Sequence, residues 1–412
     1  MSFKKNTKKF IFISLAIFIC GVVVYYLLPN VSSLVYSNDI EYNTNQEVVD
    51  NSDKNLKDTT ENTKTEDLVV DTHEEIPPVT HIKTPEHVKA LYMSGWVAGS
   101  KNFLNSLVKI ADDTEINAVV IDIKDSTGRL SFDLEDPEIK KIGSYQNRIK
   151  DIRALTTLLH SKNIYIIGRI STFQDPFLTN LKPEWALKKL SDGGIWKDRK
   201  GLSFLNPTNE NVHKYIISLA LDSYKEGFDE INFDYIRYPS DGAIKDINYN
   251  LGKGETRSDN LEKFFKYISQ EIKKDENIPI SADIFGLTTE AKDDMGIGQV
   301  WEKVIPYFDY VSPMVYPSHY PAGHAGYKNP AQYPYEVINR ALVSAVIRTK
   351  AMNQDIMKIR PWLQDFDLGT VYTKELIQAE MKATYDNGLN SWMLWDPSNK
   401  YTPSALKLET IN

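Results

Sequence analysis

From about His87 onward, short apolar runs rich in β-branched and aromatic residues alternate with longer amphipathic runs. Short runs of this composition are typical of strands that are buried on both faces. They occur at residues 88–96, 117–125, 164–171, 230–238, 278–286, 309–316, 357–366 and 390–396. The pattern therefore predicts eight strands.

The longer runs between these strands carry apolar residues three and four positions apart, which predicts helices. The clearest are residues 151–163, 211–227, 261–276, 334–353 and 373–388. Strands that alternate with helices favour parallel βαβ units. Eight units, with long insertions after the third and sixth strands, predict a (β/α)8 TIM barrel over residues 85–412. The alternative is a doubly wound open sheet, but no glycine-rich phosphate loop follows the first strand.

Charged and aromatic residues gather at the C-terminal ends of the predicted strands, whereas the N-terminal halves are mostly Val, Ile, Ala and Leu. Barrel enzymes of this kind have their active sites at the C-terminal ends. The candidate substrate-binding residues are Trp96, Asp122, Lys124, Asp125, Arg237, Tyr238, Tyr316, Trp362, Gln364 and Trp395. Asp234, Asp283 and Asp365 are the candidate catalytic acids.

Structural roles are open alternatives for several of these side chains. Asp122 and Lys124 are spaced to form a structural ion pair, and Arg237 has the alternative role of neutralising Asp234. The tryptophans have packing at the barrel end as their alternative. Asp234 and Asp283 are harder to explain in this way, because a buried carboxyl without a partner is costly.

Asp234 and Asp283 stand late in neighbouring strands, so the two carboxyls are expected to flank one small space. Two carboxyls around a space are the minimal equipment for glycoside hydrolysis. One protonates the leaving oxygen, and the other attacks the anomeric carbon or activates water. Burial and mutual repulsion separate their pKa values. We therefore predict that Asp234 is the nucleophile or base and Asp283 the acid, with no metal or cofactor.

The segment "GFDEINFDYIRYP", residues 227–239, resembles the fourth-strand motif of a family of bacterial glycoside hydrolases with a TIM-barrel catalytic domain. "AVVIDIKDSTG", "ISADIFG", "VSPMVYPSHY" and "RPWLQDF" resemble further motifs of that family, so the resemblance extends from about Leu91 to Asp396. The family is similar to the α-amylase-like clan. This resemblance implies a nucleophile at Asp234, an acid/base at Asp283 and a stabilising acid at Asp365.

Two departures from the clan pattern stand out. The clan usually has Glu at the position of Asp283, and it has Arg where Asn232 stands, two residues before the nucleophile. The same stretch also superficially resembles the fourth strand of chitinases. Ile236 takes the place of the essential acid of that motif, which argues against a chitinase mechanism.

Two other functions compete with glycoside hydrolysis. A metal-dependent polysaccharide deacetylase needs His ligands near an Asp, and His319 and His324 lie close together in the sequence. No second carboxylate cluster with ligand spacing accompanies them. A non-catalytic carbohydrate-binding barrel is the third possibility, with the aromatic rim but without turnover.

Residues 10–28 form an apolar run long enough to cross a hydrocarbon core of about 30 Å as a helix. Four lysines within residues 1–9 precede it and predict a cytoplasmic stub. A cleaved signal peptide is the alternative, and either reading places the rest of the chain outside the cytoplasm. The single cysteine, Cys20, lies in this run, so no intrachain disulfide forms.

Residues 29–84 are rich in acids and poor in large apolar residues, which predicts a disordered linker. The formal net charge of the chain is -8, which argues against a nucleic-acid partner. The sequence therefore predicts a membrane-tethered extracellular glycoside hydrolase, with a cell-wall or capsular polysaccharide as its substrate.

Overall fold

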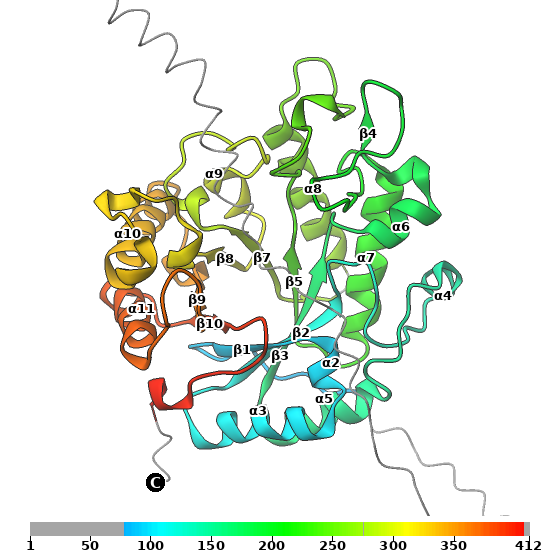
Figure 1. Ribbon diagram of the computed structural model, residues 1–412. Coiled ribbons are helices and arrows are strands. Elements are labelled where there is room, and N and C mark those ends of the chain that lie inside the picture. Colours follow the sequence, from blue (N-terminus) through cyan, green and yellow to red (C-terminus); the bar gives the residue numbers. More distant parts are fainter. Residues whose placement is uncertain (1–77, 275, 408–412) are drawn as a thin grey trace, which may run out of the picture.

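The computed structural model describes residues 78–274 and 276–407, and within them parallel strands close into an eight-stranded barrel (Figure 1). The strands are β1 (Lys89–Met93), β2 (Ala118–Lys124), β3 (Tyr165–Ser171), β5 (Glu230–Asp234), β7 (Ile280–Phe285), β8 (Tyr310–Met314), β9 (Trp362–Gln364) and β10 (Trp392–Trp395). They follow one another around the ring in chain order, and β10 pairs with β1. This confirms the TIM barrel and rules out the open sheet.

Helices lie outside the ring and connect its strands. They are α3 (Lys101–Asp113), α5 (Ile152–Ser161), α7 (Glu210–Tyr224), α8 (Arg257–Ile272), α9 (Trp301–Val304), α10 (Pro334–Ala351) and α11 (Lys374–Asp386). The shorter helices α2 (Gly95–Ala98), α4 (Pro137–Ile142) and α6 (Pro176–Leu181) lie in the loops. A small antiparallel pair, β4 (Lys188–Lys189) and β6 (Ile247–Asn248), joins the insertions behind β3 and β5.

The alternation of side chains along each strand produces two apolar layers. On β1, Leu91 packs outward with the helices, whereas Ala90 and Tyr92 face the barrel interior. The interior layer consists of Val88, Ala90, Tyr92, Ala118, Val120, Tyr165, Ile167, Tyr316, Trp362, Phe366 and Met393. The inside of the barrel is therefore filled by side chains.

Several strands are shorter than the sequence pattern predicts. β5 ends at Asp234 because Tyr235 has a φ of 48°, a left-handed conformation that a strand does not continue through. Asp125 likewise follows the end of β2. Asp125 and Arg237 therefore belong to loops at the mouth of the barrel.

A buried ion pair lies at the opposite, N-terminal end of the barrel. Arg360 Nη1 is 3.0 Å from Glu230 Oε1, and neither side chain is exposed. Tyr165 donates its hydroxyl hydrogen to Glu230 Oε2 at 3.1 Å, and the Arg360 guanidinium lies 3.9 Å from the ring centroid of Tyr310. The Glu230 carboxylate is thus paired, whereas Arg360 Nε and Nη2 are buried without a hydrogen-bond partner among the described residues.

Residues 80–84, which the composition assigns to the linker, pack against this N-terminal end. The Ile82 N–H donates to Asp229 Oδ1 at 2.7 Å, and the Thr84 hydroxyl lies 2.9 Å from the Tyr165 hydroxyl. The His81 ring stacks on Tyr224 at 3.9 Å. The predicted anchor at residues 10–28 lies outside the described residues. Among the residues that are described, no helix is both long and apolar enough to cross a membrane.

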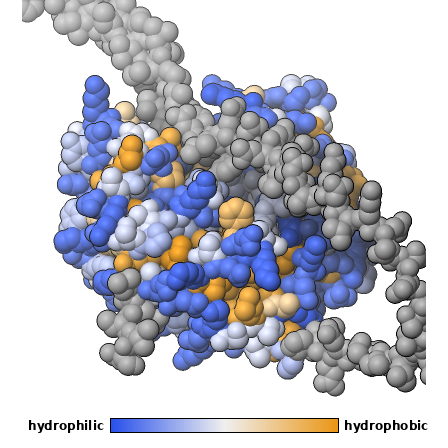
Figure 2. Space-filling model, turned by 60° about the horizontal axis from the view of Figure 1, so that its bottom comes forward, coloured by the Kyte–Doolittle hydropathy of each residue, from blue (hydrophilic) through white to orange (hydrophobic). Residues whose placement is uncertain are grey.

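The outer surface is mainly hydrophilic on the face shown in Figure 2, with hydrophobic residues between the hydrophilic ones. Phe103 on α3 and Ile347 on α10 are examples of exposed apolar side chains. Single exposed apolar residues are normal on a soluble domain. The apolar surface that stabilises the domain is buried in the two apolar layers, one inside the barrel and one between the barrel and its helices.

We predict that replacing Arg360 with Met destabilises the domain by about 3–5 kcal/mol, because Glu230 is then left buried without its counter-charge. Arg340→Met on α10 is the matched control: its side chain is 59% exposed and its pair with Glu290 is worth at most about 1 kcal/mol. Urea unfolding followed by circular dichroism measures both changes. Equal losses in the two variants would contradict a special role for the buried pair.

Candidate active site

Asp234 ends β5 at the mouth of the barrel, and both of its carboxyl oxygens accept hydrogen bonds. Oδ2 accepts from Arg169 Nε at 3.1 Å and from Arg169 Nη2 at 2.5 Å. Oδ1 accepts from the Tyr235 N–H at 2.6 Å, which the left-handed turn at Tyr235 brings into place. A guanidinium is always charged in proteins, so it stabilises Asp234 as a carboxylate.

Arg169 bridges Asp234 to a second carboxyl inside the barrel. Its Nη1 donates to Asp122 Oδ1 at 2.6 Å, and the Tyr92 hydroxyl donates to Asp122 Oδ2 at 2.7 Å. The guanidinium carbon also lies 5.7 Å from the Tyr92 ring centroid and 5.3 Å from that of Trp395. Arg169 is therefore fixed by two carboxyls and two aromatic rings.

Asp283 on β7 has no cation among its hydrogen-bond partners. Its Oδ1 accepts from Asn232 Nδ2 at 2.8 Å and from Trp362 Nε1 at 2.8 Å. Burial, followed by the negative charge of Asp234, raises the pKa of Asp283 to about 8. At neutral pH this carboxyl is protonated. Because both donors point at Oδ1, the proton is on Oδ2.

The strand register brings Asp234 and Asp283 to the same level of the barrel. Asn232 pairs with Ser281 and Phe233 with Ala282, so the next positions on β5 and β7 are the two acids. Paired residues of neighbouring parallel strands point to the same face, and the strands lie about 4.8 Å apart. The two carboxyls therefore lie side by side in opposite environments.

Aromatic rings surround the two acids. Trp395 stacks on Tyr92 at 4.0 Å and meets Trp362 edge-on at 5.6 Å. Tyr316 packs edge-on against Phe366 at 5.7 Å. Burial, and then the charges of Asp283 and Asp234, raise the pKa of Tyr316, so its hydroxyl lies in the field of both acids. Trp362, Trp395 and Tyr316 therefore lie near the two acids, at the end of the barrel where the sequence predicts them.

Lys124 does not face this space, although it follows Asp122 by two residues. A bulge between Asp122 and Lys124 makes Lys124 the register partner of Ile170, whose side chain belongs to the outer layer. Its ammonium pairs with Asp175 at 2.7 Å, and both side chains are fully buried. Lys124 is thus a structural residue, and its partner is Asp175 instead of Asp122.

Asp365 also lies apart from the two acids. It directly follows Gln364, the last residue of β9, so its side chain points away from the barrel interior. Its two carboxyl oxygens accept hydrogen bonds from the Thr402 N–H and hydroxyl, each at 2.9 Å. Burial raises the pKa of Asp365 to about 7. Among the described residues no hydrogen bond joins Asp365 to Asp234 or Asp283. The contacts favour a role in holding the C-terminal segment, and a stabilising role in catalysis stays a prediction.

Tyr238 and Gln364 are also engaged in internal contacts. The Tyr238 side chain is fully buried, and its hydroxyl donates to Asn260 of α8 at 2.8 Å. Gln364 is fully buried as well, and its Oε1 accepts from the Ser318 hydroxyl at 2.8 Å. These two residues support the mouth of the barrel, and no part of either is exposed to contact a sugar.

Trp96 and Asp125 lie at the rim of the mouth. Trp96 in α2 is 62% exposed, and the Arg148 guanidinium lies 5.1 Å from its ring centroid. Arg148 in turn pairs with Asp125 at 2.7 Å. The other oxygen of Asp125 accepts from the backbone of its own loop, so Asp125 orders the rim.

Sequence reasoning missed Arg169 and Tyr92. Both stand in strands that read as apolar, "IYIIGRIS" and "VKALYMSGW". A single Arg in an otherwise apolar strand was the available signal, because a buried guanidinium requires a carboxylate partner. Asn232 was noticed only as a departure from the clan pattern, and it proves to be a donor to Asp283.

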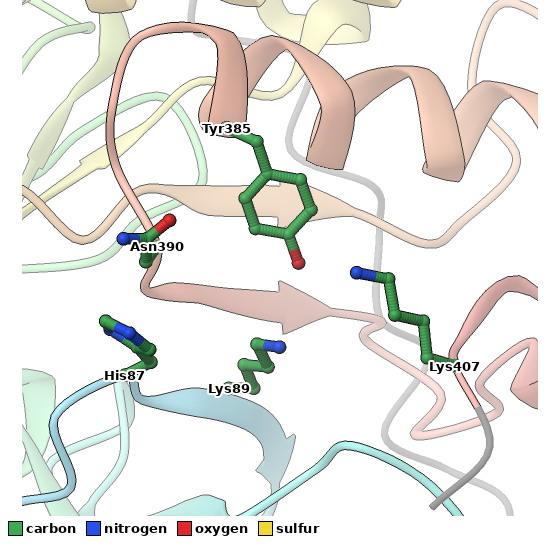
Figure 3. Close-up of a pocket in the computed structure, with 5 residues that line it drawn as sticks. All are labelled: His87, Lys89, Tyr385, Asn390 and Lys407. Carbon is green, nitrogen blue, oxygen red and sulfur yellow. The ribbon is translucent and has the colours of Figure 1, made fainter.

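A pocket of about 260 Å³ is formed by residues at the N-terminal end of the barrel (Figure 3). His87, Lys89, Tyr385, Asn390 and Lys407 line it. The Lys89 ammonium is paired with Glu115 at 2.5 Å, and its residue begins β1. The catalytic candidates all lie at the other end of the strands, so this pocket is not the active site.

The two histidines of the deacetylase hypothesis lie in different surroundings. His319 lies 5.3 Å from the Tyr316 ring, whereas His324 lies 3.2 Å from Glu290. Within residues 78–274 and 276–407, no group of three or more His, Cys, Asp or Glu side chains is placed to hold a metal ion. No observation in the structure therefore favours the deacetylase.

Comparisons with known proteins identify the family to which the barrel belongs. Residues 90–401 match the family described as "putative glycosyl hydrolase domain". A hypothetical protein from Ruminiclostridium thermocellum shares 33% identity, with 50% of this chain and 98% of that one covered and a TM-score of 0.43. The glycoside hydrolase domain of PgaB (BpsB) from Bordetella bronchiseptica shares 13% identity, with 79% and 100% covered and a TM-score of 0.54.

The likeness to the Bordetella domain concerns the fold. No curated protein matches the chain. The family match covers the whole barrel, from β1 to the segment behind β10. The chain belongs to this glycosyl hydrolase domain family.

Proposed function

We propose that the protein hydrolyses a polysaccharide with Asp234 and Asp283 as its catalytic pair. The observation that carries the proposal is the contrast between two neighbouring carboxyls. Asp234 is paired with the Arg169 guanidinium, whereas Asp283 accepts hydrogen bonds only from neutral donors. Burial and the charge of Asp234 raise the pKa of Asp283 to about 8. Environments that separate two carboxyls in this way assign the base or nucleophile and the acid.

In this mechanism Asp283 donates the proton on Oδ2 to the leaving glycosidic oxygen. Asn232 and Trp362 hold its other oxygen, so the carboxyl keeps one orientation. Asp234 attacks the anomeric carbon, and Arg169 limits its rotation through two hydrogen bonds. Trp395, which is partly exposed and stacks on the buried Tyr92 ring, offers an aromatic surface beside this space that suits the apolar faces of sugars.

The register of β5 and β7 supports retention of configuration. The two acids each stand one position beyond the last register pair, Phe233 and Ala282, on strands about 4.8 Å apart. Retaining enzymes have carboxyl groups about 5–5.5 Å apart, whereas inverting enzymes leave about 6.5–9.5 Å for a water molecule. Asp234 is then the nucleophile of a covalent glycosyl intermediate, and Asp283 deprotonates the water that resolves it.

We further propose that the enzyme is tethered to the membrane and acts outside the cell. The support is the apolar run at residues 10–28, the lysines before it and the acidic segment behind it. A tether of this kind suits a cell-wall or capsular polysaccharide as substrate, because it keeps the barrel within reach of the wall.

Asp234→Asn and Asp283→Asn separate an enzyme from a carbohydrate-binding barrel. We expect Asp234→Asn to lower the release of reducing ends from cell-wall and capsular polysaccharides by at least about 10³-fold, and Asp283→Asn by about 10²–10⁴-fold. Glycan binding in affinity gels persists in both. Asp355→Asn, an exposed helix cap for which Asn is an equal replacement, is the control. Unchanged hydrolysis in Asp234→Asn would refute the assignment, and loss of activity with a chelator would favour the deacetylase.

The raised pKa of Asp283 predicts the alkaline side of the pH profile. The general acid is present below its pKa, so kcat/KM falls as the pH rises through about 8, by about tenfold for each further unit. In Asp283→Asn the remaining activity lacks this decline, because no proton is left to lose. Initial rates between pH 5 and 10 measure both profiles. A decline of the same shape in the variant would show that another group supplies the proton.

The membrane tether is tested on the full chain. We expect it to sediment with membranes and to resist alkaline carbonate extraction, and deletion of residues 10–28 to release it. Immunoblots of the two fractions measure this. Recovery of the intact chain in the soluble fraction would contradict the anchor, and recovery of a shortened chain in the medium would favour the cleaved signal peptide.

A further inference from the structure

Arg237 carries a nearly buried positive charge that no carboxylate of the described residues neutralises. Its side chain is in a residue only 8% exposed, three positions behind Asp234. Asp234 is paired with Arg169 instead, so the structural alternative considered for Arg237 is not realised. The other arginines of similar burial, Arg148, Arg169 and Arg360, each pair with an Asp or Glu. A desolvated cation without a counter-charge is costly, and this cost requires an explanation.

The guanidinium of Arg237 lies one layer above the catalytic pair. Its central carbon is 4.4 Å from the ring centroid of Phe285, the last residue of β7. Phe285 follows Asp283 by two residues, so both side chains are on the same face of the strand. The ring centroid of Tyr235, the residue after Asp234, lies 5.3 Å from the same guanidinium carbon. Arg237 is therefore at the mouth, beside the sugar that the two acids would hold.

One edge of the Arg237 guanidinium is occupied and one is open. Nη1 donates to the Tyr238 carbonyl at 3.0 Å. Nε and Nη2 have no hydrogen-bond acceptor in the part of the chain that the structure describes. Neither nitrogen is among the buried polar atoms that are enclosed without a partner, so both remain accessible. At Arg153 and at Arg348 of this protein, the same two nitrogens, Nε and Nη2, donate to the two oxygens of a Glu carboxylate. Two parallel N–H groups fit the two oxygens of a carboxylate.

We propose that Arg237 binds the carboxylate of an acidic sugar in the unit next to the cleaved bond. The inference rests on the proposed glycosidase function and deepens it, because it names the substrate class as a glycan that carries carboxylates. The ring of Phe285 excludes water from one face of the guanidinium, and Ser240 and the Tyr238 carbonyl fix its direction. The substrate supplies the counter-charge that the protein lacks there.

The experiment measures binding to glycans with and without carboxylates, by calorimetry in the Asp283→Asn background. One pair is peptide-free peptidoglycan strands, which carry a lactyl ether with its carboxylate, and chitin oligosaccharides, which have the same backbone without the lactyl group. The other pair is hyaluronan fragments and their carboxyl-reduced forms. Asp283→Asn slows turnover by about 10²–10⁴-fold without removing a charge, so binding is measured on largely intact glycan. We expect at least one carboxylated ligand to bind about tenfold or more tightly than its neutral partner.

Arg237→Met is expected to abolish this preference and leave the affinity for the neutral glycan unchanged, whereas Arg237→Lys keeps part of it. Arg340→Met removes one positive charge from the outer helix α10 and should keep the preference in full. Equal binding of both members of each pair, binding of none of the carboxylated ligands, or a preference that survives in Arg237→Met would overturn the proposal. Loss of hydrolysis in Asp234→Asn beside any of these results would leave the glycosidase assignment standing.

Discussion

The double ion pair of Arg169 is the interaction on which the candidate active site depends. A guanidinium inside a barrel requires compensation, and two carboxyls, Asp122 and Asp234, supply it. The same contacts give Asp234 a positive partner and hold its carboxyl in one orientation. Asp283, one strand away, is left without a cation, so burial and the charge of Asp234 keep its proton. One cation shared between Asp122 and Asp234 thus creates the difference between the two members of the proposed catalytic pair.

This arrangement also accounts for the departure from the α-amylase-like pattern. Asn232 stands where that clan has an Arg, and the guanidinium comes from Arg169 on the neighbouring strand. The two residues are register partners, so the charge enters the barrel at the same level. The position that Asn232 frees is used for an amide donor to Asp283. A positive charge beside the proposed nucleophile is thus present, and a neighbouring strand supplies it.

The barrel and the position of its site follow from the sequence because both depend on periodicity. Apolar runs mark the strands, and the polar residues at their ends mark the mouth. Which face a side chain takes depends on features without a sequence signal. A bulge turns Lys124 outward, and a left-handed turn at Tyr235 ends β5 before Arg237 and Tyr238. Asp365 accepts hydrogen bonds from Thr402, which lies far along the chain, and no local sequence pattern predicts such a contact.

The central claim is that Asp283 holds a proton at neutral pH because Asp234 beside it is charged and both are buried. Carboxyl ¹³C chemical shifts of labelled aspartate, followed from pH 4 to 10 and assigned with Asp283→Asn, test it directly. We expect the Asp283 signal to titrate near pH 8 and to shift to a lower pH in Asp234→Asn. Titration of Asp283 near its ordinary value, unchanged in Asp234→Asn, would contradict the account.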